Sequence, residues 1–372
     1  MEIEAVEVLR LELSLVEAVA TSMGTHASRP VLIVCVHSKG GIGFGECSAL
    51  RDPTYTEEYT DGAEAILAQH LIPRLFEGAA RVDSAEQGLL RCAVVQGHRM
   101  AKAALEMAML DAQLREERRS LASFLGATRS LVQAGATIGM GDDETTSRAF
   151  EKAVCDGYKR VKLKIAPGRD VAITKVLRAR FPDVALIVDA NGAYDRTLAT
   201  HLSALDALDE LGLQGIEQPL APSDLSGHAR LSARLTTPVI LDESIWDEGA
   251  LEVALELHAM DGVSVKAPRL GGLIAARRVH DRCVEEGMHL AIGGMFETGI
   301  GRAAQLALGG LPGFDLPGDL GASDRYFAKD LTARHEIRDG YLAVPGGVGL
   351  GVEVDLEMLR GISVKRETFR AP

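Results

Sequence analysis

Charged side chains close five successive apolar runs of the chain, at intervals of 24 to 28 residues. This interval is typical of one strand-helix unit, so the five positions are expected at the carboxyl ends of neighbouring parallel strands. In a parallel barrel these ends converge on one mouth, where active sites lie. The positions are Lys162-Leu-Lys164, Asp189-Ala-Asn191, Glu217-Gln-Pro, Asp242-Glu-Ser and Lys266.

Three of these residues are carboxylates, which repel one another when brought together unless a cation lies between them. Asp189, Glu217 and Asp242 offer only oxygen ligands, which suits a hard ion. Mg²⁺ is therefore expected, with Mn²⁺ as a substitute. The ten histidines contain no His-x-His or His-Glu-x-x-His motif, which argues against a catalytic zinc site.

The lysines supply acid and base groups. Lys162 and Lys164 are two residues apart on a strand, so their side chains leave the same face. Neighbouring positive charge and burial both lower a lysine pKa, so one of them is expected to be a neutral base near pH 7. Lys266 would face the metal from the opposite side, so that the lysines could remove and return a proton α to a carboxylate through an enediolate.

Each motif alone has a structural explanation, since Lys-x-Lys is common at solvated edges and Asp-Ala-Asn in turns. Together they favour the functional interpretation, because charge at the end of a buried strand has a desolvation cost.

The elements that position these residues form eight short apolar runs alternating with helical segments, which predicts a (β/α)₈-type modified barrel of the α/β class. A doubly wound sheet is the alternative. The expected strands are Gln133–Met140, Arg160–Ile165, Ala185–Asp189, Gly215–Glu217, Pro238–Asp242, Gly262–Lys266, His289–Gly293 and Phe314–Leu316.

Residues before the barrel indicate an α+β domain. The first 50 residues predict an antiparallel meander, and apolar residues recur at helical spacing over 57–75 and 98–119. The turn-rich tail is expected to pack back on this first domain. The predicted organisation is a capping domain over 1–127, a barrel over 128–324, and a returning segment over 325–372.

The composition excludes several partners. The chain has 372 residues with 40 Lys plus Arg against 53 Asp plus Glu, a net charge of −13, which argues against nucleic acid or an anionic membrane surface. No apolar run approaches the length of a membrane span, and the N-terminus lacks a signal peptide pattern, so a cytoplasmic protein is expected. Five scattered cysteines suggest neither disulfides nor a thiolate zinc site.

The chain resembles the muconate-lactonizing-enzyme subgroup of the enolase superfamily over essentially its whole length, and within it the o-succinylbenzoate synthase and N-succinylamino acid (N-acylamino acid) racemase family. The motifs that carry the resemblance are Lys162-Leu-Lys164-Ile-Ala-Pro-Gly, Asp189-Ala-Asn-Gly-Ala-Tyr, Ile216-Glu-Gln-Pro-Leu, Leu241-Asp-Glu-Ser-Ile, Gly293-Gly-Met-Phe-Glu-Thr-Gly-Ile-Gly-Arg and Leu316-Pro-Gly-Asp-Leu-Gly-Ala-Ser-Asp-Arg-Tyr.

The resemblance implies a Mg²⁺-dependent enzyme acting on a small-molecule carboxylate, as a homo-oligomer. It implies that Asp189, Glu217 and Asp242 bind the metal and that Lys164 and Lys266 are the acid/base pair. It also implies that Lys162 is the electrostatic partner of the substrate carboxylate and enolate. The residues it implies at the substrate are Thr137, Asn191, Gly294, Met295, Tyr55 and Arg269, with the loop 21–29 closing over the acyl group.

The chain departs from the family after Lys266, where Ala-Pro replaces the usual Pro-Gly before Arg269 and should alter the turn. A Gly299-Ile-Gly301 motif followed by Asp319 raises a dinucleotide site as a competing interpretation. Backbone amides at a helix N-terminus receiving a substrate carboxylate explain the glycines better. The motifs also leave open a cycloisomerase, a dipeptide epimerase or a non-catalytic relative with the same fold.

Overall fold

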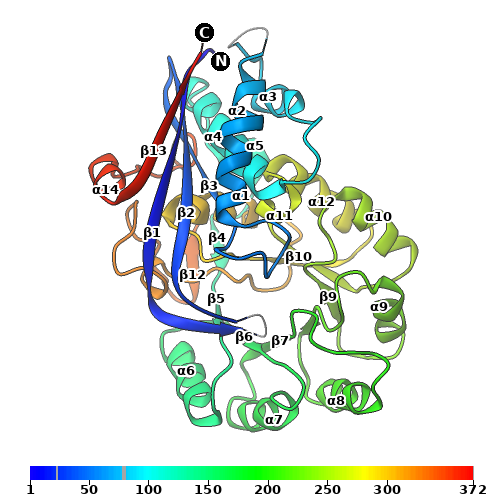
Figure 1. Cartoon of the computed structure of the whole chain (residues 1–372). Coiled ribbons are helices and arrows are strands. Elements are labelled where there is room, and N and C mark those ends of the chain that lie inside the picture. Colours follow the sequence, from blue (N-terminus) through cyan, green and yellow to red (C-terminus); the bar gives the residue numbers. More distant parts are fainter. Residues whose placement is uncertain (22–23, 78–80, 372) are drawn as a thin grey trace.

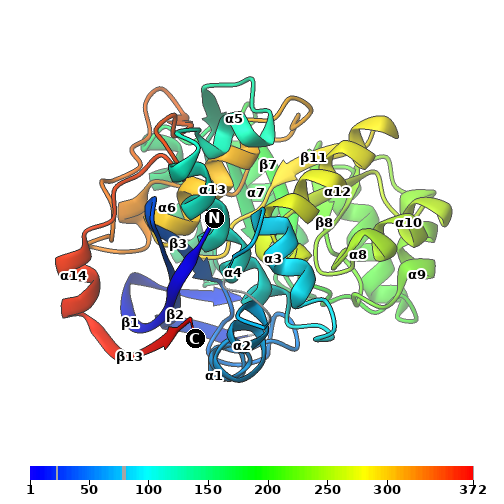
Figure 2. The ribbon, with the colours of Figure 1, turned by 90° about the horizontal axis from the view of Figure 1, so that it is seen from above.

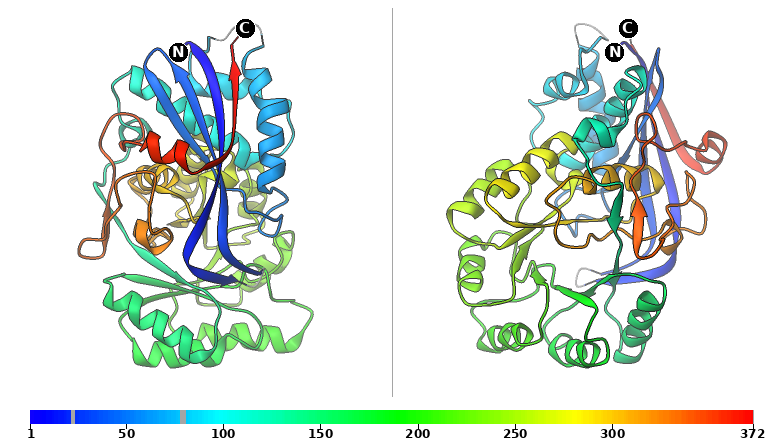
Figure 3. Two further views of the ribbon diagram at one scale, coloured as in Figure 1. Left: turned by 60° about the vertical axis from the view of Figure 1, so that its left-hand side comes forward. Right: turned by 180° about the vertical axis from the view of Figure 1, so that it is seen from behind.

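The computed structural model describes residues 1–21, 24–77 and 81–371, which form a capping domain above a barrel (Figure 1). The capping sheet has the antiparallel order β13-β1-β2-β3. Its last strand comes from the end of the chain and lies beside the first (Figure 3), with Ala5 paired to Arg370. The strands are β1 (Ile3–Thr21), β2 (Gly24–Ser38), β3 (Gly41–Cys47) and β13 (Ser363–Arg370).

The helices of the capping domain cover one side of this sheet. The long helix α4 (Arg99–Glu116) lies between β3 and the barrel, as Figure 2 shows from above. Gly43 and Gly45 of β3 allow this close approach, since a Cβ at either position would collide with the α4 backbone. The other helices are α1 (Thr60–Ile66), the π-helical turn η1 (Leu67–Leu71), α2 (Ile72–Leu75), α3 (Ala85–Arg91) and α5 (Leu121–Leu125).

The barrel contains a parallel sheet in the order β11-β10-β9-β8-β7-β6-β5. Its strands are β5 (Gly135–Ile138), β6 (Arg160–Lys164), β7 (Ala185–Asp189), β8 (Gly215–Glu217), β9 (Val239–Leu241), β10 (Gly262–Val265) and β11 (His289–Ile292). Helices α6 (Asp143–Cys155), α7 (Val171–Arg180), α8 (Ala199–Asp209), α9 (Leu225–Ser232), α10 (Glu248–Glu256), α12 (Leu273–Glu285) and α13 (Gly299–Gly309) follow them. The predicted modified barrel with a capping domain is confirmed, and the doubly wound sheet is wrong.

The eighth predicted strand, Phe314–Leu316, is wrong. An irregular segment closes the barrel instead: Asp319 N donates to Ile292 O on one side (2.7 Å), and Leu320 O accepts from Gly135 N on the other (3.2 Å). Pro317 interrupts the ladder here because proline has no N–H to donate.

Among the residues that the structure describes, one two-stranded sheet lies outside the two main sheets. The first predicted run is split, since β4 (Leu131–Gln133) pairs with β12 (Tyr341–Ala343) rather than with the barrel. The tail also contains the one-turn 3₁₀ helix η2 (Ser323–Arg325) and the short helix α14 (Leu356–Gly361). The predicted domain bounds stay predictions. Within the described residues, no helix combines the length and apolarity that crossing a membrane requires.

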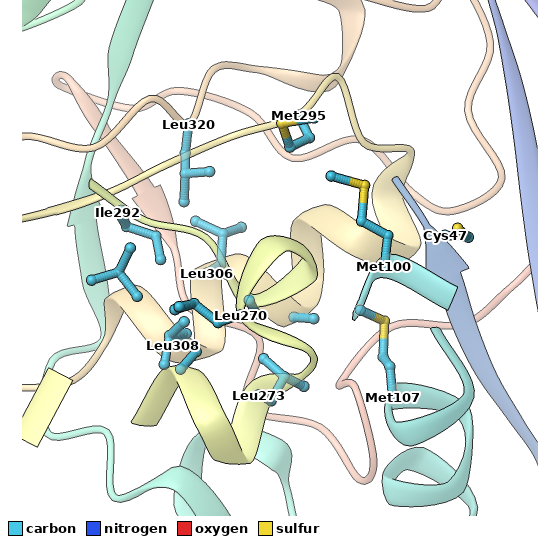
Figure 4. Packing of buried hydrophobic residues seen from close by; sticks show 14 of the residues in the cluster. Cys47, Met100, Met107, Leu270, Leu273, Ile292, Met295, Leu306, Leu308 and Leu320 are labelled. Carbon is cyan, nitrogen blue, oxygen red and sulfur yellow. The ribbon is translucent and has the colours of Figure 1, made fainter. Parts of the chain in front are cut away.

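The capping domain supplies carboxylates that cap two barrel helices. Glu106 of α4 accepts the backbone N–H groups of Leu273 and Ile274 at the start of α12. Glu46 of β3 accepts those of Thr298 and Gly301 at the start of α13. Apolar packing accompanies the first of these caps, since Met100 and Met107 of α4 belong to the same buried cluster as Leu270 and Leu273 (Figure 4). The two domains therefore share hydrogen bonds as well as a core.

The free energy of unfolding should fall as pH rises, and the Glu106→Gln variant should show a smaller fall than the wild type. Burial raises the pKa of Glu106 from 4.5 to about 7, so its folded-state contribution is complete below pH 4.5 and is lost as pH rises through 7. That loss amounts to about 3 kcal/mol for one such group. Urea unfolding at pH 5 to 8 should show a shallower slope in the variant. Glu117→Gln, at the exposed end of the same helix, should keep the wild-type slope, and an identical slope in both variants would contradict this prediction.

Candidate active site

Three carboxylates lie at the ends of neighbouring barrel strands. Asp189 and Glu217 end β7 and β8 and are paired in register, and Asp242 directly follows β9. All three are buried, with at most 2% of the residue exposed. The backbone N–H of Asp242 is fixed by a hydrogen bond to Gln218 Oε1 (3.0 Å). The ends of these three strands therefore lie together in the fold, as the sequence predicts.

Two lysines of β6 approach these carboxylates from one side. Lys162 Nζ lies 2.9 Å from Glu217 Oε1 and 3.0 Å from Asp189 Oδ2. Lys164 Nζ lies 2.7 Å from the same Asp189 oxygen and 2.6 Å from Asn191 Oδ1. Both side chains leave the same face of the strand, as alternation along a strand requires.

Lys266 approaches from the other side of the mouth. It directly follows β10, and its Nζ lies 2.7 Å from Asp242 Oδ2 and 3.1 Å from Tyr55 Oη. The ammonium also lies over the Tyr55 ring, 4.8 Å from its centroid. Tyr55 belongs to the capping domain and donates to Asp242 Oδ1 (3.0 Å), so this domain contributes to the mouth.

The altered turn after Lys266 leaves the charged residues in place. Pro268 lies in the first turn of the short helix α11 (Ala267–Leu270), where the missing N–H has no helical partner in any case. Arg269 pairs with Asp242 and donates to Tyr55 Oη (3.1 Å). Its remaining donors reach backbone carbonyls of residues 245 and 264, both at 2.8 Å. The Ala-Pro replacement is thus accommodated as the start of a helix.

The pKa values of Lys162 and Lys266 are both raised above the usual lysine value. Burial lowers the pKa of Lys162, but Asp189, Asp319 and Glu217 outweigh it and raise the pKa above its usual value. Burial likewise lowers the pKa of Lys266, and Tyr55 with nearby carboxylates raises it overall. The expectation of a lowered pKa concerned one of Lys162 and Lys164. With the protein side chains alone it is not met at Lys162, because buried carboxylates surround that ammonium.

The carboxylates respond to the same charges. Burial raises the pKa of Asp189, but Lys162 and Lys164 outweigh it and hold the pKa below the usual range. For Glu243, which follows Asp242, burial dominates and raises the pKa. Glu243 accepts from Asn191 Nδ2 (2.8 Å) through one oxygen, and its buried Oε2 has no hydrogen-bond partner.

The residues fit a hard divalent cation by their chemistry. Asp189, Glu217 and Asp242 provide buried oxygen ligands, and the unpartnered oxygen of Glu243 adds a further acceptor nearby. Over the described ranges, no three His, Cys, Asp or Glu side chains form a ready metal cage, and the Lys162 ammonium lies between Asp189 and Glu217. Occupation by a metal therefore requires this ammonium to give up part of its contacts.

Of the other residues expected at the substrate, Thr137 and Gly294 lie beside residues of the charged cluster. Thr137 is in register with Lys162, and Met295 N donates to Glu297 Oε1 (2.7 Å) in the loop after β11. A Cβ at Gly294 would lie 2.8 Å from Asp319 O, which keeps this loop close to the site. A cavity of about 570 Å³ adjoins Thr137, and its lining also includes Val19, Phe296, Arg325 and Tyr326. The predicted loop 21–29 lies partly outside the described residues.

Two sequence hypotheses about the glycine motif at 299–301 are wrong. The N-terminus of α13 is filled by the protein itself, since Glu46 accepts from Thr298 N and Gly301 N, at 3.1 and 3.0 Å. A substrate carboxylate is therefore not bound by these amides. Asp319, the residue expected to bind ribose in the dinucleotide interpretation, forms buried ion pairs with Arg160 and Lys162.

Glu243 and Asp319 are site residues that sequence analysis missed. The signal for Asp319 was available, because it lies one strand-helix unit after Gly293, in the segment that closes the barrel.

Family models and known proteins that match this chain are related to one another. Residues 5–126 match the mandelate racemase / muconate lactonizing enzyme N-terminal domain, and residues 145–358 match the enolase C-terminal domain-like family. An N-succinylamino acid racemase from Amycolatopsis is 44% identical over 370 residues, covering 98% of this chain and 99% of that protein. An o-succinylbenzoate synthase from Bacillus subtilis is 37% identical over 371 residues, covering 99% of both.

A solved structure of an enolase superfamily member from Listeria innocua has a TM-score of 0.94 and 35% identity, covering all of both chains. The fold and the strand-end charges define an α/β-barrel enzyme. The chain belongs to the enolase superfamily, with the mandelate racemase / muconate lactonizing enzyme domains.

Proposed function

We propose that this enzyme removes a proton α to a carboxylate with the help of a divalent cation, acting as an N-succinylamino acid racemase, an o-succinylbenzoate synthase, or both. The observation that carries the proposal is the placement of Lys164 and Lys266 on opposite sides of one buried carboxylate cluster. The names of the relatives at 44% and 37% identity support the substrate class.

Asp189, Glu217 and Asp242 would hold Mg²⁺, with Mn²⁺ as a substitute. A bound cation would polarise the substrate carboxylate and so make its α-proton more acidic. The residues fit this role because their oxygens are buried and are paired with flexible side-chain cations that a metal ion could replace. Asn191 would orient Lys164, which it contacts directly.

Lys164 would take the α-proton, breaking the C–H bond and leaving the electron pair in an enediolate. In racemisation, Lys266 would deliver a proton to the opposite face of the same carbon, so that the configuration inverts. In dehydration, the enediolate electron pair forms the new C=C bond as the C–O bond breaks, and the leaving hydroxyl departs as water with the proton that Lys164 has taken. Lys162 would stabilise the negative charge in both reactions.

One observation favours the racemase within this pair of activities. The chain keeps both Lys266 and Arg269 at Asp242, whereas dehydration needs only one base. The substrate would be held by Tyr55, Thr137, Gly294 and Met295, with its acyl group toward the cavity beside Thr137.

The test is proton NMR in D₂O with Mg²⁺ and, separately, N-succinyl-L- and D-amino acids and 2-succinyl-6-hydroxy-2,4-cyclohexadiene-1-carboxylate. Exchange of the α-proton with inversion is expected, and aromatisation of the cyclohexadiene would establish the synthase activity. A chelator should abolish either reaction, and added Mg²⁺ or Mn²⁺ should restore it. Full activity after complete metal removal, or no exchange on any carboxylate, would refute the proposal.

A further inference from the structure

Asp319 forms a buried bridge between two basic residues of β6. It is 6% exposed, and its two carboxylate oxygens form ion pairs with Arg160 and Lys162. These two side chains are two residues apart on one strand and therefore share a face. Arg160 is 1% exposed and lies farther from the mouth than Lys162, at the start of the strand.

The partners of Lys162 are not equivalent. Its ammonium contacts Asp189, Glu217 and Asp319, and the first two belong to the proposed metal-binding set. Asp319 is the remaining carboxylate, and it comes from the segment that closes the barrel. A cation that binds Asp189 and Glu217 would leave Asp319 as the carboxylate that still pairs with Lys162.

The backbone of Asp319 is itself fixed. Its N–H donates to Ile292 O (2.7 Å), and its carbonyl lies so close to Gly294 that a Cβ there would be 2.8 Å away. The bridge therefore connects Lys162 to β11 and to the loop that contains Met295. A shift of Asp319 would be transmitted to both sides of the mouth.

We propose that Asp319, held by Arg160, is a positioning residue that fixes the Lys162 ammonium where it meets the negative charge of the substrate. This inference rests on the proposed function for the role of Lys162. It predicts that Asp319 acts on turnover through Lys162, in addition to any contribution that its buried ion pairs make to the stability of the barrel.

Asp319→Asn should lower kcat by about 10- to 100-fold, with a smaller change in KM. Because it also leaves the buried Arg160 and Lys162 with fewer partners, its melting temperature should fall, and kcat is therefore measured at a temperature where the variant is fully folded. Asp319→Glu should recover part of kcat, because the charge is kept. In a Lys162→Met background, Asp319→Asn should cause little further loss, since both changes remove one interaction. Asp315→Asn, on the same segment but half exposed and bonded to His289, is the matched control.

A second readout needs no substrate. In protein labelled with ¹⁵N-lysine, the Lys162 ammonium signal, assigned by its loss in Lys162→Met, should broaden or disappear in Asp319→Asn and persist in Asp319→Glu. If the wild type turns over no carboxylate, the proposed function fails while this signal still decides the role of Asp319. An unchanged signal in Asp319→Asn, or a loss of kcat that adds fully to that of Lys162→Met, would overturn the inference.

Discussion

Lys266→Ala should abolish racemisation of an N-succinylamino acid while leaving α-proton exchange on one enantiomer. The reason is the arrangement of the bases, since Lys164 lies on β6 at Asp189 and Lys266 follows β10 at Asp242. Each can reach one face of the α-carbon. The measurement is proton NMR in D₂O on each enantiomer separately, with the loss of inversion expected to exceed about 10²-fold.

The fold should survive this substitution because Asp242 keeps its ion pair with Arg269. Lys102→Ala is the matched control, since Lys102 is a half-buried lysine of α4 bonded to a backbone carbonyl outside the mouth. It should racemise normally. Rapid exchange on both enantiomers in Lys266→Ala would show that Lys266 is not the second base.

Asp189→Asn should remove both catalysis and the response to Mg²⁺. The substitution keeps the size of the side chain but takes away the charge that Lys162 and Lys164 share, at 3.0 and 2.7 Å. We expect kcat/KM to fall by about 10²- to 10⁴-fold, since a metal ligand and the anchor of the base are lost together. Leaving buried charge with fewer partners should also cost about 3–5 kcal/mol of stability.

Thermal unfolding with and without Mg²⁺ separates these effects. The wild type should melt at a higher temperature with Mg²⁺, and Asp189→Asn should melt lower and show no such shift. Asp195→Asn, an exposed residue in the loop that follows, should behave as the wild type. A wild-type Mg²⁺ shift in Asp189→Asn would exclude Asp189 as a ligand.

The strand ends could be predicted because a parallel barrel imposes a repeating interval on the chain. Asp189, Glu217 and Asp242 each follow a short apolar run, so their types and spacing were sufficient. The eighth strand could not be predicted in the same way. Its run at 314–316 is apolar, but Pro317 breaks the hydrogen-bond ladder, and isolated backbone bonds close the barrel.

Contacts between the two domains could not be predicted from the sequence either. Glu46 lies more than 250 residues before the α13 N-terminus that it caps, and no local pattern connects them. The lysine pKa values were misjudged for a related reason: Lys162 has Asp319 as a third carboxylate, and its effect depends on a tertiary contact. Local periodicity is therefore enough to predict where the charged residues lie. Their pKa values depend on contacts that form only in the folded protein.

The pairing of β13 with β1 sets an order of events during synthesis. β1 and β2 pair with each other near the start of the chain, whereas the other edge of β1 has no strand to pair with until the barrel and then Ser363–Arg370 have been synthesised. An open edge strand is a template for pairing with other chains. Until its last strand is made, the chain therefore carries an unpaired edge on the capping sheet.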